Sequence, residues 1–177
     1  MDGGNSSCFL FEMGRAAAFL DRDGVLNVDT GYLHRIEDLE WIQGAQKAVG
    51  MLNEAGFLVV IITNQSGIGR GYFTEADFLK LTEGMKTALK LKGAQIDAVY
   101  FCPNHPEHGL GSYKVACDFR KPRPGMILQA IKEWEIELTQ SFFIGDRESD
   151  RKAAEAAGVK FHMFEGGDLA KFVASIL

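Results

Sequence analysis

The stretch "AAAFLDRDGVLN", residues 16–27, places two aspartates and a glycine directly after a short apolar segment. The apolar segment, residues 16–20, has the composition of a buried strand. Asp21 and Asp23 follow it so closely that their carboxylates repel each other. Ligands of parallel α/β sheets bind beyond the carboxyl ends of the strands, so we expect a bound cation here to relieve the repulsion.

Apolar, β-rich stretches recur along the chain, at residues 58–63, 98–101, 141–144 and 159–164. Most gaps between them have helical periodicity. Apolar residues follow at helical spacing after Thr74 and again after Pro124, namely Phe78, Leu81, Met85 and Leu89 in the first series and Ile127, Ile131, Trp134 and Leu138 in the second. A short helix is also predicted over residues 153–157, before Gly158. This alternation predicts an α/β fold with a largely parallel sheet.

The length of 177 residues and the hydrophobic content of 46% suit one compact domain. We expect residues 15–177 to form that domain and residues 1–14 to be a leader, either disordered or a loose first strand. The longest apolar run, residues 57–62, is far shorter than the roughly 20 residues of a membrane-spanning helix, so no membrane association is expected.

Cysteine usage and net charge bear on the cellular compartment of the protein and on whether it binds nucleic acid. The three cysteines are odd in number and irregularly spaced, which argues against a disulfide framework and for a reducing compartment. We therefore expect a cytoplasmic protein. The formal net charge of −5 disfavours broad nucleic-acid binding, because proteins that bind duplexes usually carry a basic stripe.

Polar side chains follow other predicted strands as they follow the first. Asp146 comes after the strand predicted at residues 141–144, and Thr63 and Asn64 lie at the end of the strand predicted at residues 58–63. Asp21 and Asp146 offer carboxylate oxygens suited to Mg²⁺, which takes few protein ligands and leaves sites open for phosphate oxygens. The hydroxyl, amide and backbone N–H groups at residues 63–64 suit an anion.

The long connection over residues 102–124 is predicted to be irregular, and loops of that length in compact domains are usually functional or disordered. It ends in a basic pair, and positive charge adjoins the predicted carboxylates at Arg22, Arg120, Lys121 and Arg147. Each of these residues alone is commonly part of a turn, a cap or a solvated loop. Together, in this order, they indicate a phosphorylated ligand.

The motifs in this order resemble the haloacid dehalogenase superfamily of aspartyl-phosphate phosphotransferases, over residues 16 to about 164. Four stretches are similar to the group that contains D-glycero-D-manno-heptose 1,7-bisphosphate phosphatases and histidinol-phosphate phosphatases, namely "FLDRDGVLNVDTGYL", "TNQSGIGRGYFTE", "CDFRKPRPGM" and "IGDRESD". The resemblance implies a Rossmann-like three-layer sandwich with a mainly parallel sheet. No insertion between the motifs is large enough for a separate cap domain.

The resemblance also implies a role for each motif residue. Asp21 would be the nucleophile that becomes an aspartyl phosphate, and Asp23 the general acid and base. Mg²⁺ would be held by the Asp21 side chain, the Asp23 backbone carbonyl and Asp146. Thr63 and Lys121 would stabilise the transferring phosphoryl group, since positioning and charge neutralisation provide most of the catalysis in phosphoryl transfer.

Further positions of this sequence match the parts of the family pattern that bind substrate. They are Arg22, Asp29, Gly31, Tyr32, Asn64, Gln65, Ser66, Arg120 and Arg147. Arg147 stands where the best-known members have lysine, which keeps the charge but changes its geometry. Asp150 is expected to orient the waters of the metal rather than to bind it.

The long loop departs from the family pattern. Many members bind a structural zinc there through a Cys-x-His pair and a Cys-x-Cys pair, but Asn104 and Phe119 occupy two of those positions here. A tetrahedral structural zinc normally needs four nitrogen or sulfur ligands. The remaining candidates are Cys102, His105 and Cys117, with His108 as a substitute, so we expect packing of the loop rather than zinc binding.

The implied function is that of a Mg²⁺-dependent phosphatase that removes the C7 phosphate of a heptose 1,7-bisphosphate, on the route to nucleotide-activated heptose and lipopolysaccharide. Histidinol-phosphate phosphatases, other small-molecule phosphatases of the superfamily and polynucleotide 3′-phosphatases share much of the pattern, although the net charge of −5 counts against the last. The expected partner is a phosphorylated sugar, and a monomer is the default state.

A rival from another class is a receiver-type signalling domain, which also uses an acidic cluster, a threonine and a lysine around Mg²⁺. Its phosphate-accepting aspartate would follow a middle strand, whereas the strand predicted at residues 58–63 ends in Thr63. It would also not need an acid and base such as Asp23. A third alternative is an inactive binding module of the same fold, which is disfavoured because every expected catalytic position is filled.

Overall fold

The computed structural model describes residues 14–177, so the predicted leader lies outside the described residues apart from Gly14. One parallel sheet has the strand order β3-β2-β1-β4-β5. Its strands are β1 (Ala16–Leu20), β2 (Leu58–Asn64), β3 (Ala98–Cys102), β4 (Glu137–Gly145) and β5 (Lys160–Met163). The quoted stretch therefore begins with the central strand, and the predicted parallel sheet is confirmed.

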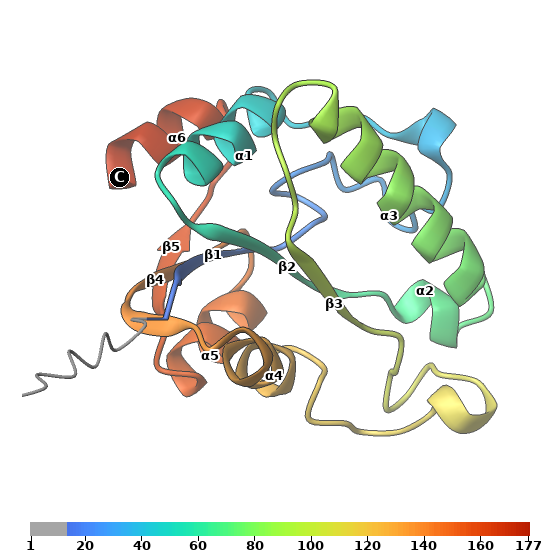
Figure 1. Ribbon diagram of the computed structural model, residues 1–177. Helices are drawn as coiled ribbons and strands as arrows, with labels where there is room; N and C mark the ends of the chain where they lie inside the picture. The colour runs from blue at the N-terminus through green and yellow to red at the C-terminus, as the bar shows by residue number, and fades with distance from the viewer. Residues whose placement is uncertain (1–13) are drawn as a thin grey trace, which may run out of the picture.

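Helices cover both faces of the sheet (Figure 1). One face carries α1 (Ala45–Glu54), α3 (Glu75–Lys90) and α6 (Leu169–Ile176), and the other carries α4 (Gly125–Trp134) and α5 (Glu148–Ala156). Side chains of β1 alternate between the two cores, because Ala18 and Leu20 pack under α1 while Ala17 and Phe19 pack against α4 and α5. Over residues 14–177, the arrangement is the predicted three-layer α/β sandwich without a separate cap domain.

The helix predicted after Pro124 ends earlier in the structure than the apolar series to Leu138 predicts. Helix α4 ends at Trp134, because Glu135 adopts a left-handed conformation with φ of 49°. Leu138 therefore lies in β4, which begins at Glu137, earlier than predicted. Glu137 pairs with Ala16 across an irregularity in register, a tertiary contact that apolar periodicity does not indicate.

Helix α5 begins before the predicted residue 153. The Asp150 carboxylate accepts a hydrogen bond from the Arg147 backbone N–H at 3.0 Å and caps the helix at that end. The capping group is thus also a member of the predicted site. This places the first turn of α5 directly after the acidic end of β4.

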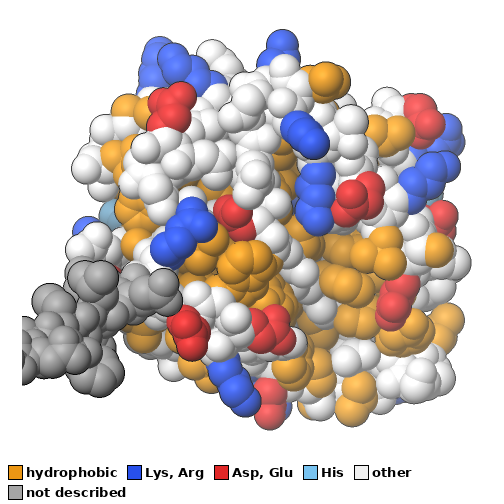
Figure 2. Space-filling model, viewed as in Figure 1, with side chains coloured by type: hydrophobic (Ala, Val, Ile, Leu, Met, Phe, Trp, Pro, Cys, Tyr) orange, Lys and Arg blue, Asp and Glu red, His pale blue; other side chains and the backbone are white. Residues whose placement is uncertain are grey.

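Short elements and long connections complete the chain. The four-residue helix α2 (Ser66–Gly69) follows β2, and single 3-10 turns form at Ile36–Asp38 and Gly111–Tyr113. The connection from β3 to α4 is otherwise irregular, as predicted. On the face shown in Figure 2, basic and acidic side chains are interspersed. Within residues 14–177, no helix has the length and apolar character needed to cross a membrane.

Candidate active site

A pocket of about 430 Å³ opens at the carboxyl ends of the central strands. Its lining residues are Asp21, Asp23, Asp29, Gly31, Tyr32, Thr63, Asn64, Gln65, Ser66, Gly67, Arg70, Arg120, Lys121, Arg147, Ser149 and Asp150. Nearly all of the predicted site residues therefore meet in one cavity. Outside this lining lie Arg22, Asp146 and the zinc candidates Cys102, His105 and Cys117.

The end of β1 places Asp21 at the base of the pocket. Its backbone N–H donates to the Ile144 carbonyl at 3.0 Å, and its Oδ1 accepts from the Arg22 backbone N–H at 2.7 Å. Gly24 then turns the chain away with φ of 86°. A Cβ at position 24 would lie 2.2 Å from Asp146 Oδ2, so glycine is required both for the turn and for the approach of Asp146.

Lys121 links two carboxylates beneath the pocket. Its Nζ lies 2.9 Å from Asp21 Oδ2 and 2.7 Å from Asp150 Oδ1, and it also donates to the Ile62 carbonyl at 2.9 Å. Burial alone would lower the pKa of Lys121, but the two carboxylates outweigh it and raise that pKa. Lys121 therefore stays protonated and positively charged. Asp150 was predicted to orient the waters of the metal, and the structure also pairs it directly with Lys121.

Burial also acts on Asp21, whose pKa it raises to about 7 against the opposing pull of Lys121. Burial and the Asp150 charge likewise raise the pKa of Asp146. The sequence predicts crowding of Asp21 with Asp23, but the charge of Asp150 raises the pKa of Asp21 more than that of Asp23 does. A bound divalent cation would lower both pKa values, because it stabilises the charged forms.

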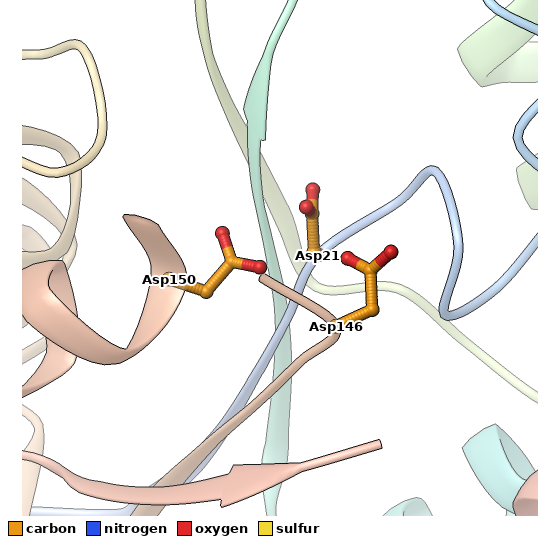
Figure 3. A group of neighbouring side chains, drawn as sticks. All are labelled: Asp21, Asp146 and Asp150. Carbon is orange, nitrogen blue, oxygen red and sulfur yellow. The ribbon is translucent and has the colours of Figure 1, made fainter. Parts of the chain in front are cut away.

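The acidic cluster has the donors that a hard cation needs. Oxygens of Asp21, Asp146 and Asp150 lie within 4.8 Å of one another, and the three carboxylates come from the ends of β1 and β4 and from α5 (Figure 3). Asp146 Oδ1 is buried without a hydrogen-bond partner among the described residues. Clustered carboxylate oxygens with an unsatisfied acceptor fit Mg²⁺.

Asp23 is held by side-chain donors on both oxygens. Arg22 Nη2 lies 2.8 Å from Oδ1 and 2.9 Å from Oδ2, Asn27 Nδ2 donates to Oδ1 at 2.9 Å, and Gln65 Nε2 donates to Oδ2 at 3.0 Å. The Arg22 side chain is buried, and its guanidinium also lies 5.6 Å from the centre of the Phe78 ring. The structure thus places Arg22 behind Asp23, not at the wall of the pocket where a substrate-binding residue was expected.

Two predicted substrate-binding side chains hold the site together. The Asn64 amide donates to the Lys121 carbonyl at 3.0 Å and accepts from the Lys121 backbone N–H at 3.1 Å. Gln65 Nε2 donates to Thr63 Oγ1 at 2.9 Å in addition to Asp23. The end of β2 is therefore joined to the long loop and to the end of β1, which keeps Lys121 and Thr63 beside Asp21.

The outer wall contains the residues predicted between positions 29 and 32. Asp29 forms an ion pair with Arg147, and its Oδ1 accepts from the Gly31 backbone N–H at 2.9 Å. Tyr32 packs edge to face on Tyr72, with 4.6 Å between ring centroids, and its side chain is exposed. This wall thus presents polar groups and an aromatic face to the pocket.

The long loop does not gather the predicted zinc candidates. The Cys102 and Cys117 sulfurs lie 3.5 Å apart, while His105 Nδ1 accepts backbone N–H groups of Glu107 and His108 at 3.2 and 3.1 Å. Among the described residues, the one group of three or more potential metal ligands is the acidic cluster. Burial raises the pKa of Cys102 to about 12, so that thiol stays protonated.

Sequence reasoning missed some residues of the site. Arg70, Gly67 and Ser149 line the pocket, and Asn27 holds Asp23. The signal for Arg70 was its position in "GIGRG", where glycines on both sides allow close packing. Arg70 could not be singled out without knowing that this turn faces the cavity.

Comparisons with known proteins agree with this geometry. A family model described as polynucleotide kinase 3 phosphatase matches residues 20–166. The chain is 50% identical over 163 residues to a D-glycero-beta-D-manno-heptose-1,7-bisphosphate 7-phosphatase from Rhodopseudomonas palustris, covering 92% of this chain and 91% of that protein.

Solved structures agree as well. A HAD-like phosphatase from Mesorhizobium loti has a TM-score of 0.82 at 34% identity, covering 94% of this chain and 78% of that one. A D,D-heptose 1,7-bisphosphate phosphatase from B. bronchiseptica, complexed with magnesium and phosphate, has a TM-score of 0.77 at 32% identity, covering 90% and 86%.

Proposed function

Because this chain belongs to the haloacid dehalogenase superfamily and, within it, to the group of heptose bisphosphate phosphatases, we propose that it hydrolyses the 7-phosphate of D-glycero-D-manno-heptose 1,7-bisphosphate. The observation that carries this proposal is the buried Asp21, paired with Lys121 and adjoining the acidic cluster at the base of an open pocket. The product would enter the synthesis of nucleotide-activated heptose.

Asp21 is the proposed nucleophile. One carboxylate oxygen attacks phosphorus as the bond from phosphorus to the sugar C7 oxygen breaks, which leaves an aspartyl phosphate. Lys121, 2.9 Å from Asp21, and Thr63 lie where they can bind the phosphoryl oxygens. Asp21, Asp146 and the Asp23 backbone carbonyl would hold Mg²⁺, which would neutralise charge on the phosphoryl oxygens.

Asp23 is the proposed acid and base. It donates a proton to the leaving C7 oxygen in the first displacement and takes one from water in the second, when water attacks phosphorus and Asp21 is released. Arg22, Asn27 and Gln65 each donate a hydrogen bond to the Asp23 carboxylate and fix its orientation for both proton transfers. These three residues therefore position Asp23.

The proposal includes the cellular setting of the protein. We place a single domain, residues 15–177, in the cytoplasm, where free thiols such as those of Cys102 and Cys117 persist, and we assign it a monomeric state. Size-exclusion chromatography with light scattering tests the monomer. A dimer that persists on dilution would contradict it.

A kinetic comparison tests the substrate. Phosphate release is measured with both anomers of heptose 1,7-bisphosphate, with fructose 1,6-bisphosphate, with histidinol phosphate and with a 3′-phosphorylated oligonucleotide, each with Mg²⁺ and with EDTA. We expect the highest kcat/KM for a heptose bisphosphate and loss of activity in EDTA. A higher kcat/KM for histidinol phosphate or for the oligonucleotide would overturn the proposed substrate.

The nucleophile has its own test. Asp21→Asn keeps the shape of the side chain but replaces the nucleophilic carboxylate by a neutral amide, so turnover should be lost while the circular dichroism spectrum is unchanged. Full activity in Asp21→Asn would overturn the mechanism and leave the choice of substrate open.

A further inference from the structure

The cations that line the pocket differ in their pairing. Lys121 and Arg147 form ion pairs with aspartates of the site. Arg70 and Arg120 line the same cavity, yet neither has a carboxylate within 4.0 Å among residues 14–177. Two guanidinium groups therefore face the pocket without an anionic partner from the described chain.

Close backbone packing brings these two arginines to the same wall. Gly69, at the end of α2, lies against the long loop, because a Cβ at this position would be 2.4 Å from the Pro103 carbonyl oxygen. The Gly69 carbonyl also accepts from the Leu110 backbone N–H at 2.7 Å. Arg70 follows Gly69 directly, and the same long loop carries Arg120, so these neighbouring segments both contribute an arginine to the pocket lining.

The hydrogen bonds of these arginines leave most donors free. Arg70 Nε is buried and has no acceptor among the described residues. Arg120 Nη1 donates to the Asn104 carbonyl at 3.2 Å, which ties the side chain to the loop. Burial and, to a smaller extent, the Arg70 charge lower the pKa of Arg120, as expected for neighbouring cations in a partly desolvated wall.

Planar guanidinium groups without an anionic partner are suited to a phosphate, which they can bind in a bidentate manner. The phosphate that Asp21 attacks has Lys121 as a partner, because Lys121 lies beside Asp21. Neither Arg70 nor Arg120 forms an ion pair with Asp21. A bisphosphate brings a second dianion into the cavity. The pocket volume of about 430 Å³ is within the range of small-ligand sites.

We propose that Arg70, together with Arg120, binds the phosphate that is not hydrolysed, which is the C1 phosphate of the heptose bisphosphate. This inference rests on the proposed function and adds Arg70 as a residue that selects bisphosphates over monophosphates. Arg70 binds the remote end of the substrate and takes no part in the displacements at Asp21.

The test compares two substrates that differ only in the C1 phosphate, heptose 1,7-bisphosphate and heptose 7-phosphate. We expect Arg70→Met to lower kcat/KM for the bisphosphate by about 10- to 100-fold, mainly through KM, because charge-assisted hydrogen bonds are lost. The 7-phosphate should change by less than about 3-fold, since it lacks the group that Arg70 binds. Arg70→Lys should recover part of the loss for the bisphosphate, because the charge remains without the bidentate geometry.

Arg123→Met is the matched control. Arg123 is an exposed arginine of the long loop that pairs with Asp118 outside the pocket, so neither substrate should respond to its loss. Equal losses on both substrates in Arg70→Met, or no loss on either, would overturn the inference while the activity of the unaltered protein still supports the function. Failure of the unaltered protein to hydrolyse either sugar would instead overturn the proposed function.

Discussion

Replacing Lys121 by methionine tests whether the buried carboxylates depend on this cation. Lys121→Met keeps most of the side-chain volume but removes the contacts at 2.9 Å to Asp21, at 2.7 Å to Asp150 and at 2.9 Å to the Ile62 carbonyl. Both carboxylates are then left without their shared counter-charge in a site where Asp150 is fully buried.

The expected loss of stability is large. Removing one partner of a buried ion pair costs about 3–5 kcal/mol, which is a substantial part of the roughly 5–15 kcal/mol that stabilises a typical domain. We expect this loss in the free energy of unfolding when Mg²⁺ is chelated. With excess Mg²⁺ the loss should be smaller, because a cation held by Asp21 and Asp146, close to Asp150, partly replaces the missing charge.

The assay is urea unfolding followed by the fluorescence of the two tryptophans, in EDTA and in excess Mg²⁺. Lys152→Met on the exposed side of α5 is the control and should change stability by no more than about 0.5 kcal/mol. A loss below about 1 kcal/mol in EDTA would refute the reasoning. So would an equal gain from Mg²⁺ in Lys121→Met and in the unaltered protein.

Two further predictions concern the turn after β1 and the long loop. Gly24→Ala should raise the Mg²⁺ concentration for half-maximal activity, because the new Cβ would lie 2.2 Å from Asp146 Oδ2. Gly56→Ala is the control, since Gly56 has a similar φ of 87° but no neighbour within 4 Å of a Cβ. This control should leave the Mg²⁺ concentration for half-maximal activity unchanged. Elemental analysis should find well below one zinc per chain, since two thiols do not complete a tetrahedral site. Stoichiometric zinc that is lost when Cys102 and Cys117 are both replaced by alanine would contradict this.

Much of the fold could be read from the sequence because the signals are local. The apolar run before Asp21 predicts a buried strand whichever strands it pairs with, and the alternation of such runs with helical periodicity predicts the layered α/β fold. Polar residues just after strands predict a site at one edge of the sheet, which is where Asp21, Thr63 and Asp146 lie. The end of α4 was missed because apolar periodicity continues into β4.

The amino-acid sequence by itself determined that Asp21, Thr63 and Lys121 reach the pocket, since strand ends and residue types are properties of short segments. Only the tertiary structure decided what those groups face. Arg22 turns to Asp23, Asp150 contacts Lys121, and Arg70 reaches the wall beside Arg120. These partners are set by packing between segments far apart in the chain, whose relative positions depend on sheet order and on close approaches such as that of Gly69 to the long loop.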